Sequence, residues 1–142
     1  MKNLYIARTS KTPEMIFNTN GKLLIWGRAL DVYDGSSKID YYEPLIRSLD
    51  DYCSNPSGCL DISIGIEFMI KYARRRLQEI LQKAVSISKL NCQVTINWYY
   101  EKDDDDSRET GEWFSQMLGW QFNILETENI YSRFLTLAQS SY

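Results

Sequence analysis

Four consecutive aspartates, Asp103 to Asp106, are the densest group of potential metal ligands in the chain. Hard divalent cations bind several oxygen ligands, so this run could hold such a cation. A cation site requires converging ligands, however, and the run lacks the interspersed glycine and the closing glutamate of calcium-binding loops. The favoured interpretation is a solvated loop that brings negative charge to the start of a helix. We therefore expect no metal site and no cofactor.

Three consecutive arginines, Arg74 to Arg76, form the other concentrated group of charges. Guanidinium groups bind phosphate and carboxylate oxygens in pairs, so the triplet could grip an anion. On a helix, three successive residues spread over about 200°, which is too wide for a compact cradle. The triplet is interpreted mainly as a charged outer face, with binding of a partner carboxylate or phosphate as the alternative.

The sequence gives no support for catalysis. It contains no histidine, which removes the commonest general base and a common transition-metal ligand. Ser63 and Gly65 do not form the Gly-x-Ser-x-Gly pattern of a nucleophilic serine. The seven glycines match neither the dinucleotide-binding nor the phosphate-loop spacing. We expect a protein that is not an enzyme.

The composition is that of one globular domain, with 142 residues of which 44% are hydrophobic. A net charge of −3 lacks the basic excess of nucleic-acid-binding proteins. No apolar run reaches the roughly 18 residues of a membrane helix, and the first residues lack a signal-peptide core. Three cysteines without a Cys-x-x-Cys pair are typical of reduced thiols. We expect a cytoplasmic protein that binds neither nucleic acid nor membrane.

The first half of the chain predicts a β-hairpin and a helix. Residues 15–17 and 22–26 are apolar strands joined by a turn that ends in Asn20-Gly21, a pair that favours tight hairpins. Apolar residues then recur at helical spacing from Ile39 to Tyr52. Asp40 followed by Glu43 predicts a capping box at the start of this helix, with Pro44 in its first turn.

The middle of the chain predicts an alternation of strands and helices. Residues 62–68 alternate between apolar and polar, which indicates a strand with one buried face. Helical spacing follows from about Lys71 to Ile87, and a second alternating stretch covers 93–100. Because helices that connect parallel strands cross over in one sense, the order from Leu60 onward predicts a single sheet in an α/β fold.

The last third predicts a loop, a helix, a strand and a further helix. The acidic loop spans 101–106, and the helix after it takes its apolar side from Trp113, Phe114, Met117 and Leu118 and ends at Gly119. A last strand is expected near 121–125. The tail from Asn129 to Ala138 has helical spacing and is expected to dock on the domain, although its apolar stripe could instead bind a partner.

The most distinctive stretch is Asn97-Trp98-Tyr99-Tyr100-Glu101 with the acidic run after it. Together with residues 12–17, 21–28, 41–45 and Gly111-Glu112, it resembles the SiaC family of bacterial regulatory phosphoproteins. The resemblance extends from about residue 12 to residue 124. It implies a SiaC-like, STAS-type regulatory domain over 1–126 and a C-terminal helical extension of the same domain over 127–142.

The resemblance implies an α/β sandwich with a mixed sheet of about four to six strands, helices mainly on one face and an N-terminal hairpin. It also implies a non-enzymatic switch in cyclic-di-GMP signalling, biofilm formation or stress control. In this family a kinase and a PP2C-type phosphatase set the phosphorylation state, and the unphosphorylated form binds and activates a diguanylate cyclase. A monomer or weak dimer is expected.

Two other kinds of function stay open. One is a sensor or enzyme that binds a small molecule or metal beside the acidic loop. The other is a structural subunit that assembles through the tail helix.

The sequence departs from the family at the phosphorylation site. Family members carry an Asn-Thr-Ser-Ser motif where a strand meets a helix, with the threonine as phosphoacceptor. An ungapped alignment puts Ile70, Lys71, Tyr72 and Ala73 there, so Lys71 occupies the acceptor position. The family's Gly-Arg-Ser-Pro-Glu segment is also altered at Gly27 to Asp31. Our hypothesis is a member without the threonine switch, locked in one binding state or directed to another partner.

We expect the partner to bind at this strand end and helix start. The predicted partner-binding residues are Arg28, Glu67, Phe68, Met69, Lys71, Tyr72, Arg74 and Arg75.

Overall fold

The computed structural model describes residues 2–33 and 40–140 and contains one six-stranded mixed sheet. The strands lie in chain order, β1-β2-β3-β4-β5-β6. β1 to β3 pair antiparallel, and β3 to β6 pair parallel. The elements are β1 (Leu4–Ile6), β2 (Glu14–Phe17), β3 (Lys22–Ala29), α1 (Glu43–Ser54), β4 (Cys59–Met69), α2 (Lys71–Ile87), the 3-10 helix η1 (Ser88–Leu90), β5 (Gln93–Glu101), α3 (Asp105–Leu118), β6 (Asn123–Thr127) and α4 (Ile130–Gln139).

The predicted hairpin is confirmed as β2 and β3. The turn is closed by hydrogen bonds from Asn18 N to Lys22 O (2.9 Å) and from Gly21 N to Asn18 O (3.0 Å). Gly21 adopts a φ of +92°, a conformation that side-chain-bearing residues rarely adopt. The short strand β1 was not predicted, and it pairs with the outer edge of β2.

The first helix starts later than predicted. Ile39 lies outside the described residues, and α1 runs from Glu43 to Ser54 with Tyr42 at its N-cap. The expected capping box is wrong, because the Asp40 carboxylate accepts a hydrogen bond from Tyr42 N (2.9 Å), ahead of the helix. Pro44 lies in the first turn as expected, since proline lacks only a donor that is unpaired there anyway.

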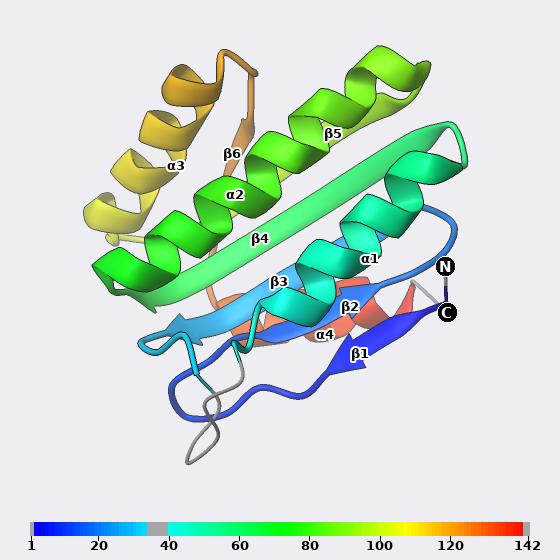
Figure 1. Cartoon of the computed structure of the whole chain (residues 1–142). Coiled ribbons are helices and arrows are strands. Elements are labelled where there is room, and N and C mark those ends of the chain that lie inside the picture. Colours follow the sequence, from blue (N-terminus) through cyan, green and yellow to red (C-terminus); the bar gives the residue numbers. More distant parts are fainter. Residues whose placement is uncertain (1, 34–39, 141–142) are drawn as a thin grey trace.

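Helices cover both faces of the sheet unequally. In Figure 1, α1, α2 and α3 cross one face, and α4 lies behind the sheet on the other. α4 contacts β3, β4 and β5, so the predicted docking of the tail helix is confirmed. The central strand β4 is therefore buried on both faces, and the expectation of a single buried face is wrong. Ser63 and Gly65, the small residues of the supposed polar face, are both buried.

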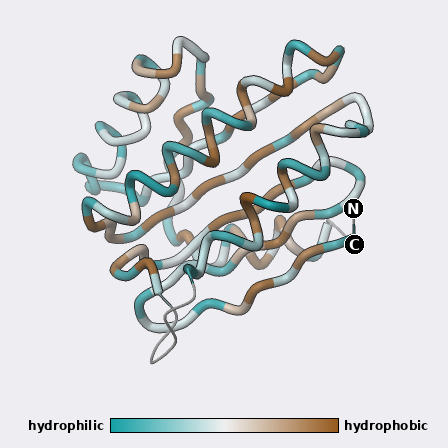
Figure 2. Tube along the Cα trace, in the orientation of Figure 1, coloured by the Kyte–Doolittle hydropathy of each residue, from teal (hydrophilic) through white to brown (hydrophobic). Residues whose placement is uncertain are grey.

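Two apolar clusters hold the layers together. The larger one lies between the sheet and α1 to α3 and includes Leu45, Ile64, Leu77 and Trp98. The smaller one lies under α4; its fully enclosed members are Ile16, Leu24, Trp26, Ile130 and Phe134. Figure 2 shows hydrophobic segments along the central strands and an alternation of hydrophobic and hydrophilic segments along α2.

The third helix begins inside the acidic run. Asp104 caps α3 by accepting a hydrogen bond from Ser107 N (3.1 Å), and Asp105 and Asp106 form the first turn. The predicted role of these aspartates at the positive end of the helix is confirmed. The predicted apolar side is partly wrong, because Trp113 and Met117 are exposed whereas Gly111 is buried against Trp98.

The remaining predicted elements are present with small shifts of boundary. α2 has the predicted bounds, β5 extends one residue further, and β6 lies two residues later than expected. Gly119 ends α3 in the left-handed conformation, as predicted. In addition, β3 and β4 are connected by α1 and pair in parallel, which the sequence analysis did not anticipate.

Replacing Tyr42 with phenylalanine should preserve or increase stability. The Tyr42 side chain is buried, and its hydroxyl has no hydrogen-bond partner among the described residues. Removing an unsatisfied buried hydroxyl should raise the free energy of unfolding by up to about 1–2 kcal/mol. Burial also raises the pKa of Tyr42. The unfolded chain, in which the pKa of tyrosine is near 10, therefore loses the phenol proton more easily than the folded protein does. Above this pH the wild-type protein should lose stability, so the advantage of Tyr42→Phe should grow.

Tyr52→Phe is the matched control. The free energy of unfolding of both variants would be measured by urea unfolding at pH 7 and at pH 10.5. Its hydroxyl donates to Cys59 O and bonds the Ser57 hydroxyl, so its loss should cost about 1 kcal/mol. Equal losses in the two variants would show that the Tyr42 hydroxyl is satisfied in solution.

Candidate functional site

A β-bulge shapes the end of β4. Gly27 pairs with Ile66 and Ala29 with Met69, so the single residue Arg28 faces both Glu67 and Phe68. An extra residue in one strand interrupts the alternation of side chains and redirects them, and such bulges are frequent next to binding sites. The bulge gathers three of the predicted partner-binding residues.

Arg28 contacts both residues of the bulge. Its Nε lies 3.4 Å from Glu67 Oε2, and its guanidinium carbon lies 5.7 Å from the centre of the Phe68 ring. Phe68 is 54% exposed, although it is a large apolar side chain. The group therefore presents an aromatic ring beside a charge-neutralised pair.

The start of α2 carries exposed positive charge, and the acidic residues Asp31, Asp40 and Glu79 line one cavity together with Arg75. Ile70 occupies the N-cap without a side-chain hydrogen bond, and the first turn contains no acid. Lys71 and Arg75 are exposed, and neither forms an ion pair within the described residues. Arg75 lies over the ring of Tyr72 (5.8 Å), which is 63% exposed. Unpaired helix N–H groups and two cations therefore share one surface.

Two predicted site residues are less exposed. Met69 is half-buried; it packs against the main core and lines a cavity together with Glu67 and Phe68. Arg74 lies between α2 and α3, with its guanidinium 4.2 Å from the Trp113 ring and its buried Nε without an acceptor among the described residues. Arg76, the third arginine, pairs with Asp40 and Glu79 and is structural. The arginine triplet thus does not form one anion cradle.

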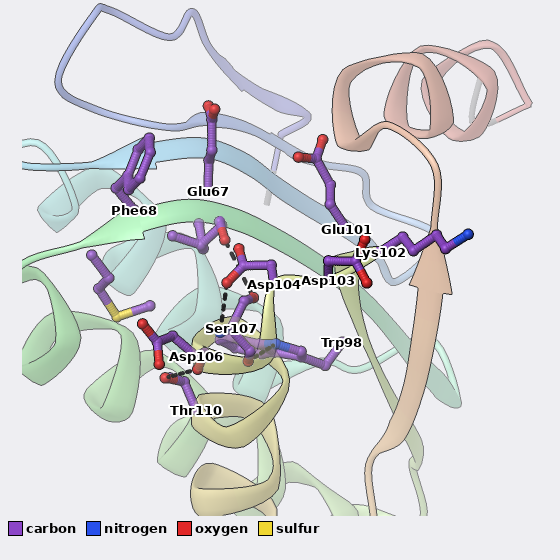
Figure 3. A pocket seen from close by; sticks show the side chains of 12 residues that line it. Glu67, Phe68, Trp98, Glu101, Lys102, Asp103, Asp104, Asp106, Ser107 and Thr110 are labelled. Atoms are coloured by element: carbon purple, nitrogen blue, oxygen red, sulfur yellow. Dashed lines mark hydrogen bonds between the residues drawn. The ribbon is translucent and has the colours of Figure 1, made fainter.

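A cavity of about 500 Å³ lies beside the bulge, where β4 and β5 end and α3 begins. Figure 3 shows its acidic side chains extending from β4, from the end of β5, from the loop after it and from the start of α3. The acidic residues around it are Glu67, Glu101, Asp103, Asp104 and Asp106, and Lys102 is the basic one. The cavity lies beside the acidic loop, which is the location that the alternative hypothesis of a small-molecule or metal sensor requires.

Three of these carboxylates are already engaged. Asp104 caps α3, Glu101 Oε2 accepts a hydrogen bond from Ile130 N (2.9 Å), and Glu67 Oε2 accepts one from the Tyr131 hydroxyl (2.8 Å). Across residues 2–33 and 40–140, no group of three or more His, Cys, Asp or Glu side chains is arranged to hold a metal ion. The acidic run starts α3, whereas Glu101 and Glu67 hold the start of α4.

A family model describes the larger part of the chain. The model of SiaC family regulatory phosphoproteins matches residues 6–127, from β1 to the end of β6. The chain belongs to the SiaC family. The match ends before α4, which starts at Ile130. Ile70 to Ala73, which the sequence analysis aligned with the family's phosphorylation motif, lie at the junction of β4 and α2.

Solved SiaC structures have the same fold at low sequence identity. Apo-SiaC from Pseudomonas aeruginosa is 16% identical with a TM-score of 0.70, over 89% of this chain and 99% of that chain. SiaC in a complex with diguanylate cyclase SiaD, of which it is the activator in that organism, is 17% identical with a TM-score of 0.75, over 87% and 99%. A search of curated proteins found no match.

No helix in the described part of the chain has the length and hydropathy needed to cross a bilayer.

Tyr131, which the sequence analysis did not select, contacts the site from the tail. Helical spacing in the tail could not reveal this role, because the hydrogen bond from Tyr131 to Glu67 joins residues that are 64 positions apart in the sequence.

Proposed function

We propose that this protein is a non-enzymatic regulator that binds a protein partner through the surface at the β4–α2 junction. The partner class is a diguanylate cyclase, as in the complex of SiaC with SiaD. The protein would thereby act in cyclic-di-GMP signalling in the cytoplasm. The binding residues are Arg28, Glu67, Phe68, Lys71, Tyr72 and Arg75, with Met69 supporting from the core and Arg74 at the edge toward α3.

The observation that carries this proposal is the exposed aromatic and cationic surface at the junction. Phe68 and Tyr72 are 54% and 63% exposed, and aromatic side chains of this kind are preferred anchors at protein interfaces. Arg75 lies over the Tyr72 ring, and Lys71 begins α2, whose N-cap has no side-chain hydrogen bond. This charge distribution fits an acidic segment of the partner.

We propose further that the family's threonine switch is absent. A phosphate at a helix start adds nearly two negative charges next to free backbone N–H groups. Lys71 at this position supplies a fixed positive charge instead and has no hydroxyl to modify. The partner surface would then keep one charge state, independent of kinase and phosphatase.

A non-catalytic role is supported by the engagement of the acidic side chains. Asp104, Glu101 and Glu67 form hydrogen bonds that hold α3 and α4, and the chain contains no histidine. These carboxylates act as structural acceptors rather than as a proton-transfer pair.

Lys71→Glu should weaken partner binding at least tenfold, a loss of about 1.4 kcal/mol or more, because it puts a negative charge where an acidic partner segment binds. Binding would be measured by calorimetry against the diguanylate cyclases of the source organism. Lys89→Glu is the matched control, since Lys89 is exposed in η1 at the far end of α2 and the charge change is identical.

Equal affinities for the two variants would refute the proposed surface. Intact-mass analysis after incubation with the cognate kinase tests the missing switch separately. Stoichiometric phosphate between residues 67 and 76 would contradict it.

A further inference from the structure

The first two residues of α4 hold two carboxylates of the candidate site. Ile130 N donates to Glu101 Oε2 (2.9 Å), and the Tyr131 hydroxyl donates to Glu67 Oε2 (2.8 Å). Both glutamates line the acidic cavity. Figure 3 shows Glu101 extending toward the start of this helix. The tail helix therefore contacts the site directly, although it packs on the opposite face of the sheet from α2.

The position of α4 is fixed by a close fit to the sheet. Phe134 stacks on Trp26 with ring centres 5.4 Å apart and an interplanar angle of 19°. Gly65 lies beneath, and a Cβ at this position would come within 2.6 Å of Phe134 and 2.9 Å of Ile130. A methyl group here would force the Phe134 and Ile130 side chains to move, so Gly65 permits the close docking that brings Tyr131 to Glu67.

From Tyr131 the contacts continue to the partner surface. The guanidinium of Arg8 covers the Tyr131 ring at 4.7 Å and helps to hold it. Glu67 Oε2 is shared between the Tyr131 hydroxyl and Arg28 Nε, and Arg28 in turn lies over the exposed Phe68 ring. An exposed ion pair alone holds its side chains weakly, so the added hydrogen bond from Tyr131 fixes the Glu67 carboxylate.

We propose that Tyr131 is a positioning residue, through which docked α4 fixes Glu67 and Arg28 in the arrangement that the partner binds. This inference rests on the proposed function, since it concerns the same surface. It also gives α4 a role in partner binding, although the family match ends at residue 127, before this helix begins. Partner affinity would thus depend on a helix outside the matched family region.

The test compares full-length Tyr131→Phe with Tyr100→Phe. The first variant keeps the ring beneath Arg8 and removes only the hydroxyl. The control removes a hydroxyl for which the described residues provide no hydrogen bond. In NMR spectra, Tyr131→Phe should shift the Arg28 Nε–H and Phe68 ring signals and leave Arg74 Nε–H unchanged, whereas Tyr100→Phe should leave all three unchanged. Tyr131→Phe should also bind the diguanylate cyclase about threefold to tenfold more weakly, as expected for one lost hydrogen bond to a charged group.

A titration identifies the interaction independently of any partner. Burial, the hydrogen bond to Glu67 and the charge of Glu67 raise the pKa of Tyr131. Glu67→Gln keeps the size of the acceptor and removes its charge, so the pKa of Tyr131 should fall, as followed by tyrosine ring signals. Gly65→Ala should reproduce the Arg28 and Phe68 shifts by displacing α4.

The outcomes separate the two proposals. Unchanged Arg28 and Phe68 signals in Tyr131→Phe would overturn the positioning role, whatever the partner does. Unchanged affinity of Tyr131→Phe, together with weakened binding by Lys71→Glu, would also overturn it and leave the proposed function intact. If Lys71→Glu binds like its control, the proposed surface fails, and the NMR shifts alone then decide whether Tyr131 positions Glu67 and Arg28.

Discussion

Gly21→Ala should lower the free energy of unfolding by roughly 3–5 kcal/mol, combining an unfavourable backbone conformation with overpacking. A Cβ on Gly21 would lie 2.0 Å from the carbonyl oxygen of Cys59, a backbone atom at the start of β4. That segment cannot withdraw easily, because Asp61 N donates to Gly21 O at 2.7 Å. The hairpin and the first parallel strand pair should therefore be destabilised together.

Gly58→Ala separates the two contributions. Gly58 has a similar φ of +102°, but a Cβ there would meet no atom within 4 Å. Its substitution should cost only the conformational strain, about 1–2 kcal/mol. Chemical denaturation followed by circular dichroism measures both. Equal losses would mean that the Cys59 carbonyl yields to the new methyl group.

Phe134→Ala should remove about 3–5 kcal/mol from the docking of α4 and leave the rest of the domain folded. Phe134 is fully buried, and its ring contacts Trp26 on one side and Tyr99 on another. Hydrogen exchange should accelerate in α4 and stay slow in α2 and β5. Trp26 fluorescence should shift to the red as its indole becomes hydrated.

Leu135→Ala is the neighbouring control. Leu135 is 59% exposed, so its truncation should change stability by less than about 0.5 kcal/mol. Accelerated exchange throughout the sheet in Phe134→Ala would contradict an independently docked α4. Such a result would make α4 part of the central cooperative unit.

Features set by neighbouring residues could be predicted from the sequence. Asn20-Gly21 located the hairpin, and helical spacing predicted α2 with its bounds. The stretch from Asn97 to Glu101 indicated the SiaC family, which the family model matching residues 6–127 confirms. Each of these signals lies within a few residues of the chain. Local periodicity and turn chemistry are sufficient for them.

Features set by distant residues could not be predicted. The alternation in β4 suggested an open face, but Gly65 lies against Ile130 and Phe134 of α4, and Ser63 is buried beside Asn97. Trp113 was assigned to the core by spacing, whereas it lies under Arg74 at the surface. The bulge that groups Arg28, Glu67 and Phe68 depends on pairing between β3 and β4, which no single segment encodes.

The order of the strands has a consequence for how the chain is made. Every strand pairs with the one synthesised just before it, so the sheet can extend strand by strand as the polypeptide leaves the ribosome. α4 follows all six strands in the chain and must return across β5 and β4 to reach β3. Until α4 docks, Trp26 lacks the Phe134 ring that stacks on it, so the shielding of this indole reports the docking of α4.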